Sequence, residues 1–237
     1  MNTSVGGSVR QQKVGGSAAL YLAAAFVAAM PYFLVFVKIQ GVVDPVEKVS
    51  LLVANHGSMQ VMYLVSYVIF GIVLAVLALA LSARLSDGAP ILTQAATAVG
   101  LIWAFVLVAS GMIYNAGMAA VAGLHGASPA RAVSTWQAIE PVAQGLGGSG
   151  GELLGGLWVL LVSVAALRTR RLPGVLNWLG VAIGVAGILS VVPVLKDLGY
   201  AFGLLEIVWF VWLGIVMLRT GPRPVVPILR GDEGGRA

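Results

Sequence analysis

The sequence contains no cysteine, only two histidines and few charged residues. Without cysteine there can be no disulfide, thiolate nucleophile, zinc–thiolate site or iron–sulfur cluster. Charged residues make up 10% of the chain, against about 25% in an average soluble domain, and hydrophobic residues make up 59%. The composition therefore predicts an integral membrane protein surrounded by the lipid bilayer. The net charge of +5 is scattered along the chain, so nucleic acid is not an expected partner.

Apolar runs dominate the chain and alternate with short polar connections. Each run can cross the roughly 30 Å hydrocarbon core as an α-helix, and none shows the alternation of a membrane-barrel strand. We predict an all-α polytopic membrane protein: a six-helix transmembrane domain over 17–219, a cytoplasmic segment over 1–16 and a flexible cytoplasmic tail over 220–237. The six predicted transmembrane helices are 17–38, 59–82, 91–118, 150–168, 174–195 and 201–219.

Lysine and arginine are distributed unevenly among the connections, and this sets the expected orientation. With the N-terminus in the cytoplasm, ten of the 14 basic residues fall on that side and four on the other, as the positive-inside rule requires. The turn LRTRRLP, with Arg168, Arg170 and Arg171, contributes most. We expect both termini in the cytoplasm. The first apolar run is longer than the core of a secretory signal, so we expect a retained span with a kink at Pro31.

The two longer outer connections carry helix-start signals. In the first, Asp44 followed three residues later by Glu47 is typical of an N-cap with a capping box. In the second, Ser128 and Pro129 precede an apolar stripe that includes Trp136. We expect two short interfacial helices on the outer membrane surface, with Trp136 at the level of the head groups.

The stretch GLGGSGGE, residues 145–152, contains a G-x-G-x-x-G pattern of the kind that binds dinucleotides. Nucleotide binding is not expected, because a helix-like segment rather than a strand precedes it and a basic turn follows where an acidic residue is needed. Glycine at every fourth residue instead indicates a helix face that lets a neighbouring backbone approach closely in lipid. The glycines with this predicted packing role are Gly147, Gly151 and Gly155 in the fourth span and Gly180 and Gly184 in the fifth.

Two glutamates fall inside predicted spans, Glu152 at the outer end of the fourth and Glu206 in the sixth. A carboxyl group in or near hydrocarbon costs at least about 2.5 kcal/mol on insertion scales, so it needs a partner or a purpose. One interpretation is a polar pocket open to the outside, where both bind a ligand or a proton, with Asn115, His56 and His125 nearby. The other is that both glutamates are hydrogen-bonded to neighbouring helices and the loop residues are solvated at the interface.

The chain has no motif typical of a metal site or a catalytic centre. It lacks H-E-x-x-H, Glu-x-x-His and G-x-S-x-G, and neither histidine lies in a predicted span, where a haem ligand would be needed. We therefore expect no metal, no cofactor and no catalytic residue.

The segment LRTRRLPGVLNWLGVAIGVAGIL resembles a hairpin of the six-span bacterial membrane proteins of domain-of-unknown-function family four-three-eight-six. The matching positions are Arg168 to Arg171, Leu172-Pro173 and Trp178-Leu179-Gly180, and the closing span LLEIVWFVWLGIVML is similar as well. The outer segment VEKVSLLVANHGSMQ matches loosely, with Met59-Gln60 where family members often have arginine. The resemblance implies a six-helix fold in the bacterial inner membrane and no established activity.

Three functions stay open on this evidence. The preferred one is a non-catalytic membrane subunit or helper that packs against a membrane protein partner, or a second copy, through its glycine-rich helix faces. The first alternative is a small-solute or proton-coupled carrier that uses Glu152 and Glu206. The second is a membrane enzyme acting on a lipid-like substrate at the outer face, which needs His56 or His125 within bonding reach of these carboxylates.

Overall fold

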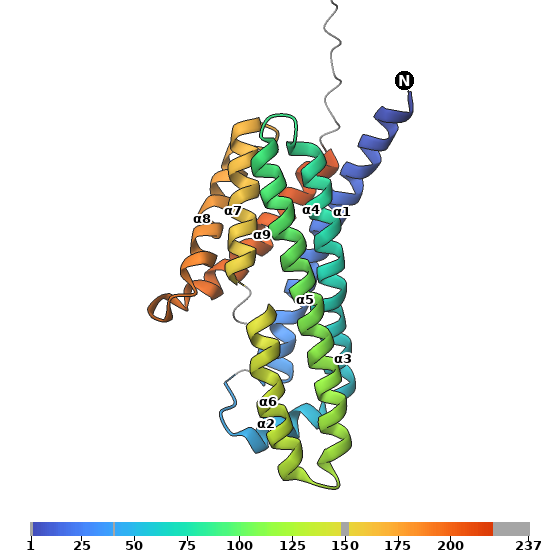
Figure 1. The fold of residues 1–237 in the computed structure, drawn as a ribbon, viewed down its shortest axis with the longest axis vertical. Helices are drawn as coiled ribbons and strands as arrows, with labels where there is room; N and C mark the ends of the chain where they lie inside the picture. Colours follow the sequence, from blue (N-terminus) through green and yellow to red (C-terminus); the bar gives the residue numbers. More distant parts are fainter. Residues whose placement is uncertain (1, 40, 148–151, 220–237) are drawn as a thin grey trace, which may run out of the picture.

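The computed structural model describes residues 2–39, 41–147 and 152–219, and the side chains from Arg10 onward within these ranges. All regular elements of this part are helical (Figure 1). In chain order they are α1 (Asn2–Pro31), the π-helical turn η1 (Tyr32–Phe36), α2 (Pro45–Ala54), α3 (His56–Tyr63), the π-helical turn η2 (Leu64–Ile69), α4 (Phe70–Leu85), α5 (Pro90–His125), α6 (Pro129–Gly147), α7 (Glu152–Thr169), α8 (Gly174–Leu189), the 3-10 turn η3 (Pro193–Leu195) and α9 (Leu198–Arg219).

Among the described residues, five helical segments are long and apolar enough to cross a membrane, and α8 is a shorter apolar helix. The prediction of an all-α polytopic membrane protein is confirmed. The fifth predicted span, 174–195, is too long, because α8 ends at Leu189. Pro193 holds the preceding residue, Val192, in an extended conformation, which a helix cannot continue through.

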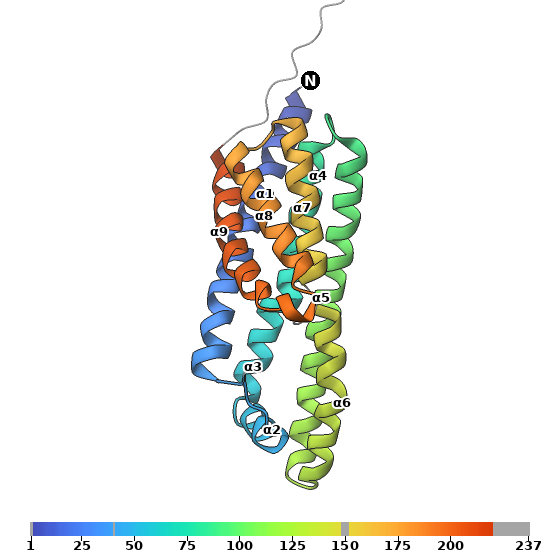
Figure 2. The ribbon, with the colours of Figure 1, turned by 90° about the vertical axis from the view of Figure 1, so that its left-hand side faces the viewer.

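Successive helices run up and down the long axis of the molecule (Figures 1 and 2). The start of α1, the α4–α5 turn, the α7–α8 turn and the end of α9 lie together at one end, which we call the arginine end. The α5–α6 turn lies at the opposite end, which we call the hairpin end. Both described chain ends are thus on the same side, as the predicted topology requires.

The second expected short helix is longer than predicted. α6 continues through Pro141 to Gly147 and packs lengthwise against α5 (Figure 2). Trp136 is only 2% exposed and contacts Tyr114, with ring centroids 6.1 Å apart, so its ring is buried in the protein rather than exposed to the surroundings. Its large apolar ring fills the space between α5 and α6, which stabilises the hairpin more than exposure at the interface would.

The first of the two short helices is present as α2. The side chain of Asp44 accepts a hydrogen bond of 2.8 Å from the backbone N–H of Val46, and Pro45 occupies the first helical turn. Lys48 on this helix forms an ion pair of 3.1 Å with Glu140 of α6, so α2 is tied to the hairpin.

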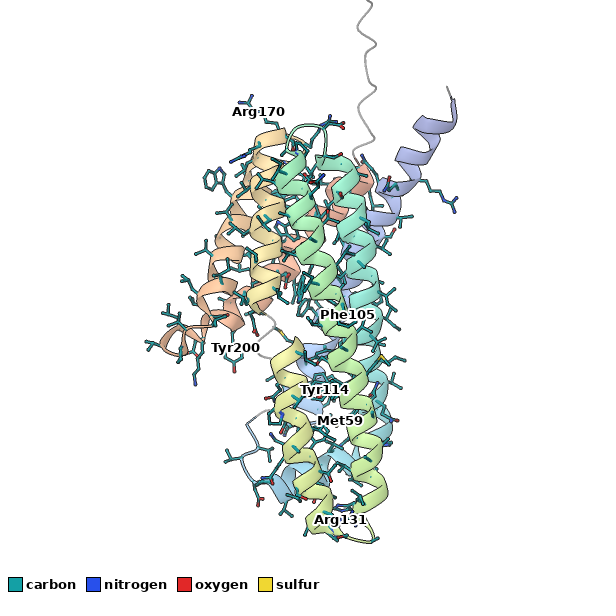
Figure 3. All side chains as sticks on the ribbon, in the orientation of Figure 1. Met59, Phe105, Tyr114, Arg131, Arg170 and Tyr200 are labelled. Carbon is teal, nitrogen blue, oxygen red and sulfur yellow. The ribbon has the colours of Figure 1, made fainter. Side chains whose placement is uncertain are left out.

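Two apolar cores are stacked along the molecule. The first lies at the arginine end and is rich in aromatic residues, among them Trp103, Trp158 and Trp209. The second fills the hairpin end around Met59, which lies close to Tyr114 in Figure 3. Large apolar side chains also face outward, as Phe105 does with 71% exposure, and this is the surface that lipid covers in a membrane protein.

Candidate functional site

Glu206 lies in the middle of α9, on the side of the helix that faces the first core. The buried residues of α9 recur at helical spacing, and Glu206 takes the position between Phe202 and Trp209 in this stripe. Its side chain is 0% exposed, and among the described residues neither carboxyl oxygen has a hydrogen-bond partner. The sequence predicted its place in a span, but the expected hydrogen bond to a neighbouring helix is absent from the described part of the chain.

Aromatic rings form the layer of the core next to Glu206. Trp209 and Phe210, one turn further along α9, have ring centroids 5.5 Å apart, and Trp158 of α7 lies 5.9 Å from Trp209 and 6.3 Å from Phe210. Trp103 of α5 extends the layer, 5.7 Å from Trp158. These rings are apolar apart from the indole nitrogens of Trp158 and Trp209, so an ionised carboxylate at Glu206 would be disfavoured.

Glu152 is the first residue of α7 and is only partly buried. Its carboxyl lies beside the first turn of α9, where a Cβ on Gly199 would be 3.6 Å from Glu152 Oε1. Gly199 and Glu206 are seven residues apart and lie on the same side of α9, about 10 Å along its axis. The two predicted carboxyl groups therefore lie along the same face of α9, about two helical turns apart.

The two glutamates differ in their surroundings. Glu152 is at the first residue of α7 and keeps partial contact with the surroundings of the protein. Glu206 is in the middle of a helix, where all backbone N–H groups are already bonded. Along α9 and α7, Glu206 lies about 20 Å and Glu152 about 26 Å from the arginine end, so both belong to the far half of a bilayer that begins there.

A cluster of tyrosines lies in the second core. Tyr67 belongs to it and lies on η2. Its ring lies 5.5 Å from Tyr63 and 5.7 Å from Tyr114, and these two rings stack at 4.4 Å. The three rings thus form an aromatic cluster that belongs to the second core. The sequence signal for this cluster was Tyr63 and Tyr67 four residues apart in an apolar run.

Unpartnered polar atoms also lie on the other side of the aromatic layer. Among the described residues, the indole nitrogens of Trp158 and Trp209 and the hydroxyl of Ser163 are buried without a hydrogen-bond partner. Ser163 and Trp209 meet at the backbone of Gly180, where any side chain would collide with both. These groups lie toward the arginine end of α7 and α9, beyond Glu206.

The three other ligand candidates are separated from the glutamates. Gly147 packs against Leu107 of α5, and from this level His125 is about 27 Å and Asn115 about 12 Å further along α5 toward the hairpin end. His56 begins α3, about 21 Å along the helix from Phe70, whose ring contacts Trp103. No group of three or more metal-binding side chains is present in the described ranges. The histidines are therefore too far away to act on a substrate together with Glu152 or Glu206.

The glycines lie in helix contacts within the chain. A Cβ at Gly184 would be 2.7 Å from the carbonyl oxygen of Gly156, and one at Gly155 would be 2.8 Å from Trp103. Gly180 packs against Ser163, and Gly147 against Ser110 and Leu107. Gly151 lies outside the described residues. The predicted close approach of backbones thus occurs between α7 and α8 of one chain.

No family model, curated protein or solved structure matches the chain. The resemblance to family four-three-eight-six stays a prediction.

Proposed function

We propose that the chain is a membrane carrier of protons in which Glu206 binds the proton and Glu152 exchanges it with the medium on the side of the hairpin end. The observation that carries this proposal is the Glu206 carboxyl, 0% exposed in a membrane-spanning helix and without a hydrogen-bond partner among the described residues. An ionisable group that persists at such a position has a functional role by default, because its insertion is costly.

A proton fits Glu206 better than a metal cation does. A cation of the alkali or alkaline-earth type needs several oxygen ligands, whereas rings of Trp158, Trp209 and Phe210 form the adjacent layer. Protonation removes the charge without any further ligand. Glu152, partly exposed and about two helical turns along α9 from Glu206, supplies the step between the buried site and water.

The two other functions have less support from the described residues. A helper that binds its partner through glycine-rich faces would use Gly155, Gly180 and Gly184, but these already pack within the chain. An enzyme would need a histidine beside the carboxyl groups. Both histidines instead lie several helical turns away, toward the hairpin end.

Carbodiimide labelling tests the protonation of Glu206. Dicyclohexylcarbodiimide is apolar and reacts with protonated carboxyl groups, so it should modify Glu206 in the intact protein in lipid. Peptide mass spectrometry should find the adduct on the α9 peptide, and Glu206→Gln should abolish it. Glu47, exposed on α2, is the internal control and should stay unmodified. Modification of Glu47 with an unmodified Glu206 would contradict the proposal.

A further inference from the structure

Arginines and apolar side chains share the wall of a surface cavity at the arginine end. The cavity has a volume of about 470 Å³ and lies between the end of α4, the α7–α8 turn and the last turns of α9. Four of its lining residues are Arg84, Arg170, Arg171 and Arg219, and its apolar side includes Trp212 and Ile215. Figure 3 shows Arg170 at the tip of the turn, at the opposite end from Arg131. The cavity is distinct from the site of Glu206.

Two of the four guanidinium groups, those of Arg84 and Arg171, are held in place by neighbouring residues. Arg84 donates a hydrogen bond of 2.7 Å to Gln12 Oε1 of α1 and one of 3.0 Å to the carbonyl oxygen of Arg171. Arg171 contacts Asp87 Oδ2 at 3.4 Å, and Asp87 is the only acidic residue at the arginine end in the described part of the chain. Positive charge is therefore in excess around the cavity.

We propose that this cavity binds the phosphate group of an anionic membrane lipid. Guanidinium groups match phosphate oxygens in charge and in hydrogen-bond geometry, and basic pockets between membrane helices are typical sites for anionic head groups. Ile215 is exposed and Trp212 partly buried on the same wall, so an acyl chain or glycerol backbone lies against apolar surface while the phosphate meets the arginines. A soluble phosphate would leave this apolar wall uncovered.

Native mass spectrometry of the purified full chain in detergent tests the proposal. Phosphatidylglycerol, phosphatidylcholine and inorganic phosphate serve as probes. The wild-type chain should retain phosphatidylglycerol in preference to phosphatidylcholine. The double variant Arg170→Gln, Arg219→Gln removes two exposed arginines of the cavity, and we expect about 30-fold weaker phosphatidylglycerol binding, since each basic residue contributes about 1 kcal/mol.

Two matched double variants distinguish lipid binding in the cavity from general electrostatic attraction to the arginine end. Lys13→Gln, Arg168→Gln removes the same charge from the same end outside the cavity lining and should leave binding near the wild-type level. Arg170→Lys, Arg219→Lys keeps the charge and should retain most of the binding. The proposal would be overturned if both glutamine double variants lost the same amount of phosphatidylglycerol binding. Equal retention of phosphatidylglycerol and phosphatidylcholine by the wild-type chain would also overturn it. Complete displacement of phosphatidylglycerol by excess inorganic phosphate would assign the cavity to a soluble phosphate compound instead.

Discussion

Glu206 stands in a stripe of α9 that otherwise contains large apolar side chains and glycine. The position is one that packing alone would fill with leucine, methionine or an aromatic residue. A buried polar group without a partner lowers the free energy of unfolding by about 1–3 kcal/mol. Proteins keep such costly residues where function requires them.

Replacement of Glu206 by methionine should therefore stabilise the chain. The side chains are similar in length, and Glu206→Met removes an unpartnered carboxyl, so we expect the free energy of unfolding to rise by about 1–3 kcal/mol. Thermal unfolding in detergent, followed by circular dichroism, measures the change. Glu47→Met, at an exposed position, is the control and should have little effect. A destabilised Glu206→Met chain would show that the carboxyl has a structural partner.

The candidate site was partly predictable at this scale. Glu152 and Glu206 could be found in the sequence because a carboxyl group in an apolar run is conspicuous. Asn115, His56 and His125 were expected nearby, but their distance from the site depends on how far α3 and α5 extend past the α7–α9 contact. The place of Tyr67 in the tyrosine cluster depends on ring contacts between separate helices, which no local pattern contains.

At the scale of helices, the α7–α8 hairpin depends on direct backbone contact. Gly156 and Gly184 face each other, and a Cβ on either would lie within 2.8 Å of backbone atoms of the other helix. Helix association in lipid relies on such packing.

A methyl group at this contact should separate the two helices. Gly184→Ala is expected to lower the free energy of unfolding by about 1–3 kcal/mol through overpacking. Gly174→Ala is the matched control, because no atom lies within 4 Å of a Cβ there and alanine favours a helix over glycine. Urea or thermal unfolding of both variants in the same detergent measures the difference. Equal stabilities would mean that α7 and α8 are not closely packed.

The presence of the helices was predictable from the sequence, but the positions of their ends were less so. The start of α2 was predicted correctly because Asp44 and Pro45 determine it through contacts with their immediate neighbours in the chain. α6 extends beyond its expected end because its packing on α5, including the 2.7 Å hydrogen bond from Ser110 Oγ to the Ala143 carbonyl, outweighs the local tendency of Pro141 to end a helix. Such long-range contacts are not visible in the local sequence.

At the scale of the whole molecule, α5 is about 54 Å long, much more than the 30 Å of hydrocarbon that it has to cross. If the bilayer begins at the arginine end, the α5–α6 hairpin with α2 projects from the opposite surface. The apolar runs in the sequence predicted the spans, and the distribution of lysine and arginine predicted their direction. Neither could show that two of the predicted outer segments pack together into one unit.

The absence of cysteine makes this arrangement directly testable. Ser134→Cys on α6 and Ser86→Cys at the α4–α5 turn each introduce one thiol at an exposed position. With the arginine end in the cytoplasm, a membrane-impermeant maleimide added to intact spheroplasts should label Ser134→Cys. Ser86→Cys should react only after permeabilisation. Labelling of both variants in intact spheroplasts, or of Ser86→Cys alone, would contradict the proposed topology.

Proton uptake by vesicles that contain the purified chain and an internal pH indicator tests the central claim most directly. After a pH step, the wild-type chain should acidify the lumen faster than protein-free vesicles do. Glu206→Gln should reduce the rate to that of protein-free vesicles, Glu152→Gln should slow it, and Glu47→Gln should leave it unchanged. If the Glu206→Gln chain, inserted to the same level, carried protons as fast as the wild type, Glu206 would not be the proton site.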